Sequence, residues 1–296
     1  GDIHSCWDDF DLPYYQSLKV DITLFTGDIG PKDRIHGIIQ DLKAICPNSA
    51  GILGNHDGAS MPHVIAEALE QDTLSRTFAS GHGERVKALR QLMGEGDLGF
   101  RCRDLPELEV SLLGMRPHST GGARHHFPYT LSGEYGVDDA LAAHRATLDA
   151  SQHRAVIFLG HNGPFGLGAE PNDPYGVDFR AGGGDLGDKD YAQALEDAKA
   201  QGKRVLLAIG GHMHDLLHRR SRHLGRRRTI GELDGTLVIN PCQIPRIKRE
   251  GRGSLHRHVE VLVERGAGQI AVEEVSWLPK RGEQSRERIF EGCLCQ

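Results

Sequence analysis

Aspartate, asparagine and histidine follow glycine at five places in the first 214 residues, and these side chains could bind metal ions. Carboxylate, amide and imidazole groups suit manganese, iron or zinc better than a metal that prefers thiolates. A single aspartate can also bridge two ions through its two oxygens. The five places are Gly1-Asp2-Ile3-His4, Gly27-Asp28, Gly54-Asn55-His56-Asp57, Gly160-His161 and Gly211-His212-Met213-His214. Together they predict a metal centre.

Each of these pieces is weak evidence when taken alone, because Gly-Asp is usually a turn and a single Gly-His usually has no function. Their position is the stronger signal, since four of the five directly follow apolar runs that read as strands. In open α/β sheets, ligands bind at the carboxyl ends of the strands. The glycines allow a sharp turn and a close approach of the backbone. We therefore favour a metal site over a series of ordinary turns.

Apolar runs and amphipathic stretches alternate along the first two thirds of the chain, which predicts an α/β sheet with crossover helices. The expected strands are residues 20–25, 50–53, 110–113, 155–159 and 205–209, and the expected helices are 34–45, 62–69, 85–93, 138–148 and 191–200. The last third predicts consecutive, more antiparallel strands at 227–233, 236–240, 256–263 and 270–277, with hairpin turns at 234–235 and 265–268.

One domain over residues 1–278, followed by a C-terminal tail at 279–296, is the expected organisation, because neither an internal repeat nor a linker is evident. The start reads as the turn after a strand, so we expect the first strand to lie upstream of residue 1. Two long segments rich in glycine and proline, 116–136 and 162–187, are read as binding loops or lids rather than simple connections.

Composition limits the functional classes. The 296 residues carry a net charge of -6, so no overall basic field points to nucleic acid. No apolar run is long enough to span a membrane. The six cysteines are scattered without zinc-site spacing, which favours free thiols in a reducing compartment, the cytoplasm or the plastid stroma. Oligomeric state is left open.

The order GDIH, GD, GNHD, GH and GHMH resembles the signature of the calcineurin-like metallophosphoesterases, over residues 1–214. The resemblance implies a four-layer α-β-β-α sandwich and a dinuclear centre of manganese, iron or zinc. It implies that Asp2, His4 and His214 hold one ion, that Asn55, His161 and His212 hold the other, and that Asp28 bridges them. His56 is then the catalytic histidine beside the leaving group, with Asp57 orienting it. A bridging hydroxide would attack phosphorus.

Three departures separate the chain from the protein Ser/Thr phosphatases of this superfamily. Ser5 stands where they have glycine, Asp28 is followed by Ile29-Gly30-Pro31 without their Asp-Arg-Gly element, and the third motif ends in Asp57 where they have glutamate. The sequence looks more like an uncharacterised cyanobacterial and plastid subgroup. The implied substrate is a phosphate ester, either a mono- or a diester.

Other polar residues leave alternatives open. Arg116, with His118 just beyond it, could grip a substrate phosphate or could anchor a loop. The arginines at 219–222 and 226–228 could attract a polyanion, but we favour a charged hairpin on a net acidic protein. The alternatives to a phosphoesterase are thus a non-enzymatic scaffold that retains the fold, or a nuclease. A scaffold typically loses ligands, and here none of the expected ones is missing.

Overall fold

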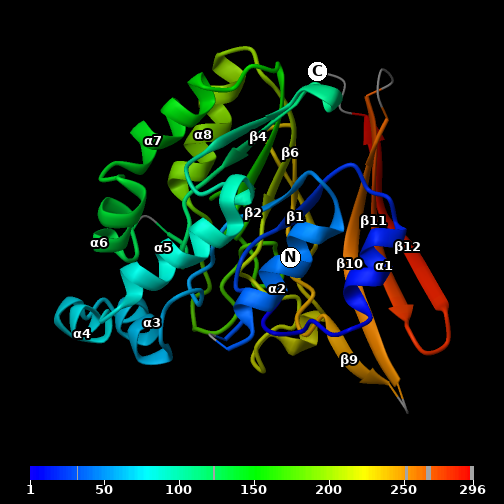
Figure 1. The fold of residues 1–296 in the computed structure, drawn as a ribbon, viewed down its shortest axis with the longest axis horizontal. Coiled ribbons are helices and arrows are strands. Elements are labelled where there is room, and N and C mark those ends of the chain that lie inside the picture. The colour runs from blue at the N-terminus through cyan, green and yellow to red at the C-terminus, as the bar shows by residue number, and fades with distance from the viewer. Residues whose placement is uncertain (32, 123, 251–252, 265–267, 294–296) are drawn as a thin grey trace.

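A computed structural model describes residues 1–31, 33–122, 124–250, 253–264 and 268–293, and shows two sheets packed face to face (Figure 1). The larger sheet has six strands in the order β3-β4-β5-β6-β8-β7. Their bounds are Cys102–Leu105 (β3), Val110–Gly114 (β4), Ala155–Gly160 (β5), Arg204–Gly210 (β6), Ile230–Leu233 (β7) and Thr236–Ile239 (β8). The pairs β4-β5, β5-β6 and β6-β8 are parallel, so their carboxyl ends lie on one edge.

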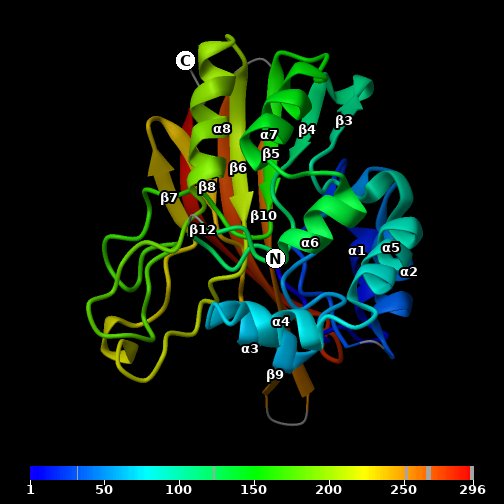
Figure 2. The same ribbon diagram turned by 90° about the vertical axis from the view of Figure 1, so that its left-hand side faces the viewer.

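Helices cover the outer face of this sheet. The helices α7 (Ala140–Asp149) and α8 (Lys189–Ala200) lie in front of β5 and β6 in Figure 2. Alternate residues of the strands explain the two-sided burial: Val156 and Phe158 pack beneath the helices, whereas Ile157 and Leu159 face the second sheet. The strands are nearly continuous apolar runs because both faces are buried.

The second sheet is antiparallel, in the order β12-β11-β10-β9. Its strands are Ile247–Glu250 (β9), Gly253–Val263 (β10), Gln269–Leu278 (β11) and Glu283–Cys293 (β12). Ile270 and Val272 belong to the core between the sheets. On the opposite face, the ring of Tyr14 from α1 (Asp11–Ser17) stacks on Trp277 at 3.9 Å between centroids. The predicted α-β-β-α sandwich is confirmed, with α1 in the fourth layer.

A two-stranded parallel pair, β1 (Thr23–Phe25) and β2 (Ser49–Gly51), extends the core toward the N-terminal helices. Phe25 packs with the buried face of α2 (Ile35–Ile45) and with α5 (His82–Met93). The helices α3 (Met61–Ala68) and α4 (Asp72–Phe78) form the lower left corner in Figure 1. Short elements are a helical segment at Pro128–Tyr135 and 3-10 turns at Gly94–Gly96, Pro106–Leu108 and Arg222–Leu224.

The expected tail at 279–296 is wrong for its larger part, because Glu283–Cys293 forms β12 and pairs antiparallel with β11. The polar appearance of this segment has a physical reason. Arg286 and Arg288 both bond the carboxylate of Glu273 on the neighbouring strand. Their charges therefore form ion pairs across the strands, and the sequence alone suggested a solvent-exposed tail. Of the C-terminal Cys-x-Cys pair, Cys295 lies outside the described residues.

The N-terminal residues are held without a strand of their own. The amides of Ile3 and His4 donate to the carbonyl of Asp28 at 3.3 and 2.6 Å, and that of Ser5 donates to Ile29. Asp2 is anchored separately, through Thr26. No helix in the described ranges combines the length and apolarity needed to cross a bilayer.

Candidate metal centre

The polar residues that follow the strands converge on one edge of the molecule. Asp28 follows β1, Asn55 follows β2, His161 follows β5, and His212 with His214 follow β6. The N-terminal segment adds Asp2 and His4 to the same place. All seven residues singled out as ligands therefore come from strand ends or from the segment that lies against them.

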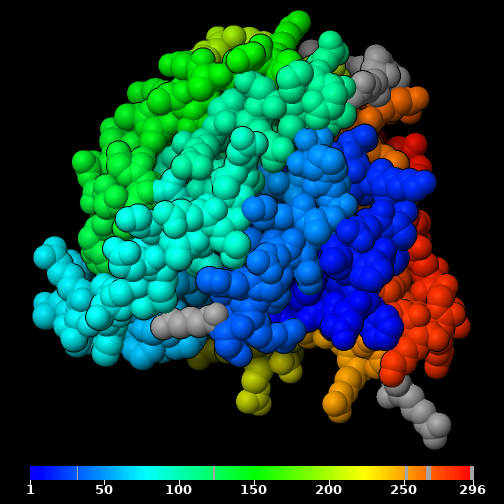
Figure 3. All heavy atoms as spheres, viewed as in Figure 1, coloured from blue at the N-terminus to red at the C-terminus, as the bar shows by residue number. Residues whose placement is uncertain are grey.

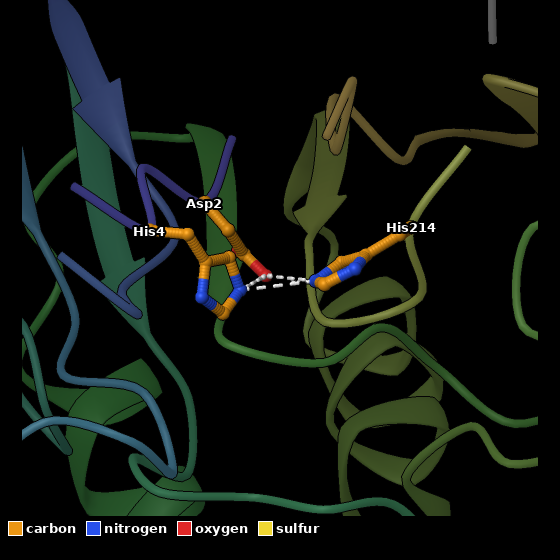
Figure 4. Close-up of side chains that lie close together, drawn as sticks. All are labelled: Asp2, His4 and His214. Carbon is orange, nitrogen blue, oxygen red and sulfur yellow. Dashed lines mark hydrogen bonds and ion pairs between the residues drawn. The ribbon is translucent and has the colours of Figure 1, made fainter. Parts of the chain in front are cut away.

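The first ligand group comprises Asp2, His4 and His214, whose side chains point toward one another (Figure 4). The Nε2 atoms of the two histidines are 3.0 Å apart, and they lie 4.0 and 3.9 Å from Oδ2 of Asp2. Thr26 donates to Oδ1 of Asp2 at 2.6 Å, and the His212 amide donates to Oδ2 at 3.0 Å. These bonds fix the carboxylate so that it faces the two imidazoles.

The second group comprises Asp28, His161 and His212, whose possible ligand atoms lie within 4.8 Å of one another. The Nε2 atom of His161 is 2.8 Å from Oδ1 of Asn55, which brings the amide oxygen into the same group. The other ring nitrogen, Nδ1, lies 2.6 Å from the carbonyl of Thr26. A backbone carbonyl at Nδ1 orients the ring and leaves Nε2 for a metal, as is usual for metal-binding histidines.

Asp28 stands between the two groups. Its Oδ2 atom is 3.4 Å from Nε2 of His4 in the first group and 3.8 Å from Nε2 of His161 in the second. Oδ1 accepts a hydrogen bond of 2.9 Å from the His56 amide. One carboxylate is thus within reach of both ligand sets, which is the arrangement that a bridging aspartate needs.

The electrostatics of the site fit bound cations. Burial raises the pKa of Asp28 well above its usual range, and the nearby charges of Asp2 and Asp57 raise it further. Burial also lowers the pKa of His212 and of His161, which favours the neutral imidazole that binds metal. Buried carboxylates of like charge are costly unless they coordinate cations. The candidate ligand atoms are oxygen and nitrogen, without sulfur.

Two of the preceding glycines are required by close approach. A Cβ atom on Gly54 would overlap the carboxylate of Asp28, and one on Gly211 would overlap that of Asp2. His4, Asp28 and His212 themselves have positive φ, at 45°, 45° and 66°. Such conformations are uncommon outside glycine and are held where tight turns aim functional side chains.

A sequence model of the calcineurin-like phosphoesterases matches residues 1–216, which contain every one of these side chains. The chain belongs to the calcineurin-like phosphoesterase family. The family membership makes the protein a hydrolase of phosphate esters that depends on metal. No curated protein matched the sequence.

In this calcineurin-like phosphoesterase, His56 lies at the open side of the centre. Its side chain is 36% exposed, and its Nε2 is 4.0 Å from Oδ2 of Asp28. It is therefore next to the ligands but still accessible to a substrate.

Asp57, expected to orient the ring of His56, has different partners. It is fully buried, and its two oxygens accept hydrogen bonds from the amides of Ile29 and Gly54, each at 2.8 Å. Among the described contacts it makes no hydrogen bond to the His56 ring. The carboxylate instead joins the loops that carry Asp28 and Asn55.

The prediction that Arg116 and His118 bind substrate is wrong, because both are buried away from the open site. Arg116 is 2% exposed and pairs with Asp188 at 2.7 Å and with Asp190 at 3.2 Å. It therefore anchors a loop, which was the alternative to binding a substrate phosphate. His118 is fully buried, with Nδ1 2.8 Å from the carbonyl of Gly54. It supports the ligand loop from behind.

The arginine stretch after His214 is partly structural. Arg227 is 3% exposed and bonds Asp178 as well as the carbonyls of residues 171, 173 and 176. Arg226 pairs with Glu274, and Arg228 with Asp173. These three arginines anchor the second long loop and β11, whereas Arg219, Arg220 and Arg222 of the same stretch are exposed.

A groove of about 490 Å³ opens beside the centre, and sequence reasoning missed it. His4, Asp28 and His56 are among the residues that line it. Others come from α2, α5, the start of α3 and neighbouring loops, and include Ile35, Ala88 and Met61. The sequence does not show that these segments lie together, because each of the three residues fits the apolar pattern of its own helix.

Proposed function

We propose that the protein hydrolyses phosphate mono- or diesters at a dinuclear metal centre. The observation that carries the proposal is the position of the Asp28 carboxylate, within 3.4 Å of the His4 imidazole and 3.8 Å of the His161 imidazole. We assign Asp2, His4 and His214 to one ion, Asn55, His161 and His212 to the other, and Asp28 to both. Two bound cations, of manganese, iron or zinc, would polarise the phosphate oxygens and lower the pKa of the attacking water.

His56 is the residue that we assign to the leaving group. It lines the groove beside Asp28 and His4, and its side chain is open to a substrate. Its backbone amide is tied to Asp28, which holds the residue at a defined distance from the phosphate site. A protonated imidazole there donates its proton to the departing oxygen and neutralises the negative charge that develops on it.

Asp57 acts as a positioning residue in this proposal. By accepting hydrogen bonds from the Ile29 and Gly54 amides, it holds the bridging carboxylate and Asn55 in register. Burial raises the pKa of Asp57 to about 7, although the hydrogen bonds from these two amides favour the ionised carboxylate.

The proposal is tested with purified protein, Mn²⁺ and aryl phosphate mono- and diesters. Turnover that disappears on chelation and returns with added metal supports it. Measured metal occupancy without turnover of either ester class would contradict it and would favour the non-enzymatic scaffold. The nuclease alternative now rests on the exposed Arg219, Arg220 and Arg222, and a salt-dependent DNA or RNA binding assay tests it.

We further propose that residues 1–293 form a single domain, since β11 and β12 pack on the same core as the first 216 residues. A reducing compartment, the cytoplasm or the plastid stroma, agrees with the free thiols of Cys6, Cys46, Cys102 and Cys242. Cell fractionation of the natural host tests the proposed compartment. Membership of the cyanobacterial and plastid subgroup stays a prediction.

A further inference from the structure

The groove beside the metal centre has an apolar wall. Its lining includes Pro31, Ile35 at the start of α2, and Ala88 and Leu89 of α5. The two helices are in contact, and Figure 3 shows the light-blue atoms of α2 beside the cyan atoms of α5 on this face. Apolar side chains at the entrance of a site favour an apolar ligand group, because contact with them removes both surfaces from water.

Apart from the candidate ligands and His56, the polar side chains among the described residues that line the groove are Ser5, His36 and Arg85. The Nε atom of Arg85 donates to the carbonyl of Gly58 and its Nη1 to that of Ser80, at 2.5 and 3.1 Å. The guanidinium is therefore tied to the loops that precede α3 and α5. Among the described lining residues away from the metal centre, a sugar or polyphosphate group could contact only Ser5, His36 and this guanidinium through its oxygens.

The apolar surface continues out of the groove along α3. Met61 lines the groove and is 58% exposed. Ile65 and Leu69 follow at intervals of four residues, so they lie on the same face of the helix, and they are 51% and 64% exposed. Exposed apolar residues that form a row, rather than single ones, mark contact sites. This row begins where the groove ends.

We infer that the substrate is a phosphate ester whose organic group is an extended hydrocarbon. The phosphate lies at the metal centre, and the ester carbon points past His56 into the groove between α2 and α5. A chain longer than the groove continues over Met61 toward Ile65. This inference rests on the proposed function, because it takes the phosphate to be held by the metals, and it adds the class of substrate.

The test measures binding of n-alkylphosphonates, which carry no ester bond to hydrolyse, to the Mn²⁺-loaded protein by titration calorimetry. The series runs from methyl to octyl. We expect the dissociation constant to fall about two- to fourfold for each added methylene, the range set by partial to full burial of a CH₂ group. A dissociation constant that does not change with chain length would overturn the inference.

Variants locate the hydrocarbon. Ala88→Phe fills the groove and should remove most of the gain in affinity from methyl to octyl, while binding of methylphosphonate is retained. Gln91→Phe, an exposed position on the same helix outside the groove, is the matched control and should keep the full gain. Met61→Ser adds no bulk and should weaken octyl binding by several-fold. Equal gains in all of these proteins would contradict the placement in the groove.

Hydrolysis of n-alkyl phosphates separates this inference from the proposed function. The leaving alcohols in the series have similar acidity, so differences in kcat/KM report contact with the chain rather than chemistry. If the proposed function fails, no member is hydrolysed with any metal. If only the hydrocarbon assignment fails, all members are hydrolysed with the same kcat/KM. A rise with chain length that Ala88→Phe abolishes supports both.

Discussion

The Nη2 atom of Arg116 lies 2.7 Å from Oδ1 of Asp188, and both side chains are almost completely buried. The pair joins the first long loop to the residue before α8. Ser119 donates to the same carboxylate oxygen at 2.7 Å, and Asn162, next to the candidate ligand His161, lies 3.3 Å from it. The ion pair therefore holds together segments that lead to the metal centre without contacting a substrate itself.

Replacement of Arg116 by alanine should lower the free energy of unfolding by about 3–5 kcal/mol, because it leaves buried carboxylates without their cation. Urea or guanidinium titration measures the change. Arg145→Ala is the control, since Arg145 pairs with Asp197 at 2.9 Å on the surface, where solvent screens the pair, and its loss should have a much smaller effect. Equal effects of the two substitutions would show that the buried network is not a stabilising anchor.

Metal stoichiometry distinguishes the bridging ligand from a ligand of one ion. Asp28→Ala should reduce bound metal from two ions per chain toward none, because one carboxylate serves both groups. His214→Ala should lose one ion and retain the other. Elemental analysis of the purified variants gives the counts. Loss of a single ion in Asp28→Ala would contradict the bridging role.

His56→Ala should lower kcat by about 10²–10⁴-fold, the usual contribution of a general acid, and should leave the metal content unchanged. The matched control is His36→Ala. His36 also lines the groove and is exposed, but it is not among the residues that contact Asp28. The loss should be smaller for aryl esters, whose leaving groups need less protonation. A kcat within a factor of three of the wild type would remove His56 from the catalytic assignment.

Acid stability should depend on Glu67 in α3, which is 1% exposed. Burial opposes its ionisation, but the nearby His126, 3.7 Å away, and hydrogen bonds from Ser75 and the Phe127 amide outweigh this effect and lower its pKa from 4.5 to about 2. A lowered pKa in the folded state stabilises the protein above the unfolded value. That contribution is lost as the pH falls from about 4.5 toward 2.

Denaturant titrations of wild type and Glu67→Gln between pH 7 and 3.5 measure this contribution. The stability difference between the two proteins should be largest at neutral pH and shrink below about pH 4.5. Glu70→Gln, an exposed position just after the same helix, serves as the control and should show no such trend. A difference that stays constant with pH would contradict the ionised state of Glu67.

The sequence predicted the strands and helices that repeat a strong apolar pattern, and several limits agree to within two residues. The run at 205–209 lies within β6, and 155–159 lies within β5. Each is apolar on both faces and is followed by glycine. In contrast, β12 was missed because its outward residues are arginine and glutamate, and only the pairing with β11 shows that these charges neutralise one another.

Residues brought together from strand ends were the predictable part of the site, because parallel strands place their carboxyl ends on one edge whatever the loops do. Arg116 was not predictable. Its partners Asp188 and Asp190 lie 72 or more positions away, at the start of a helix. Acidic residues are common there because they interact favourably with the helix dipole, so they do not point to a buried arginine. The groove was missed for a related reason, since Ile35 and Ala88 meet only after α2 and α5 pack.

The imidazoles of His4 and His214, which nearly touch, are separated by 210 positions of the chain. Ribosomes add roughly 5–20 residues per second, so the first histidine emerges on the order of 10 to 40 s before the second. During synthesis, Asp2 and His4 are thus exposed to the metal ions of the cell without their partners. The full set of candidate ligands is therefore assembled late in synthesis, only when β6 has joined the sheet.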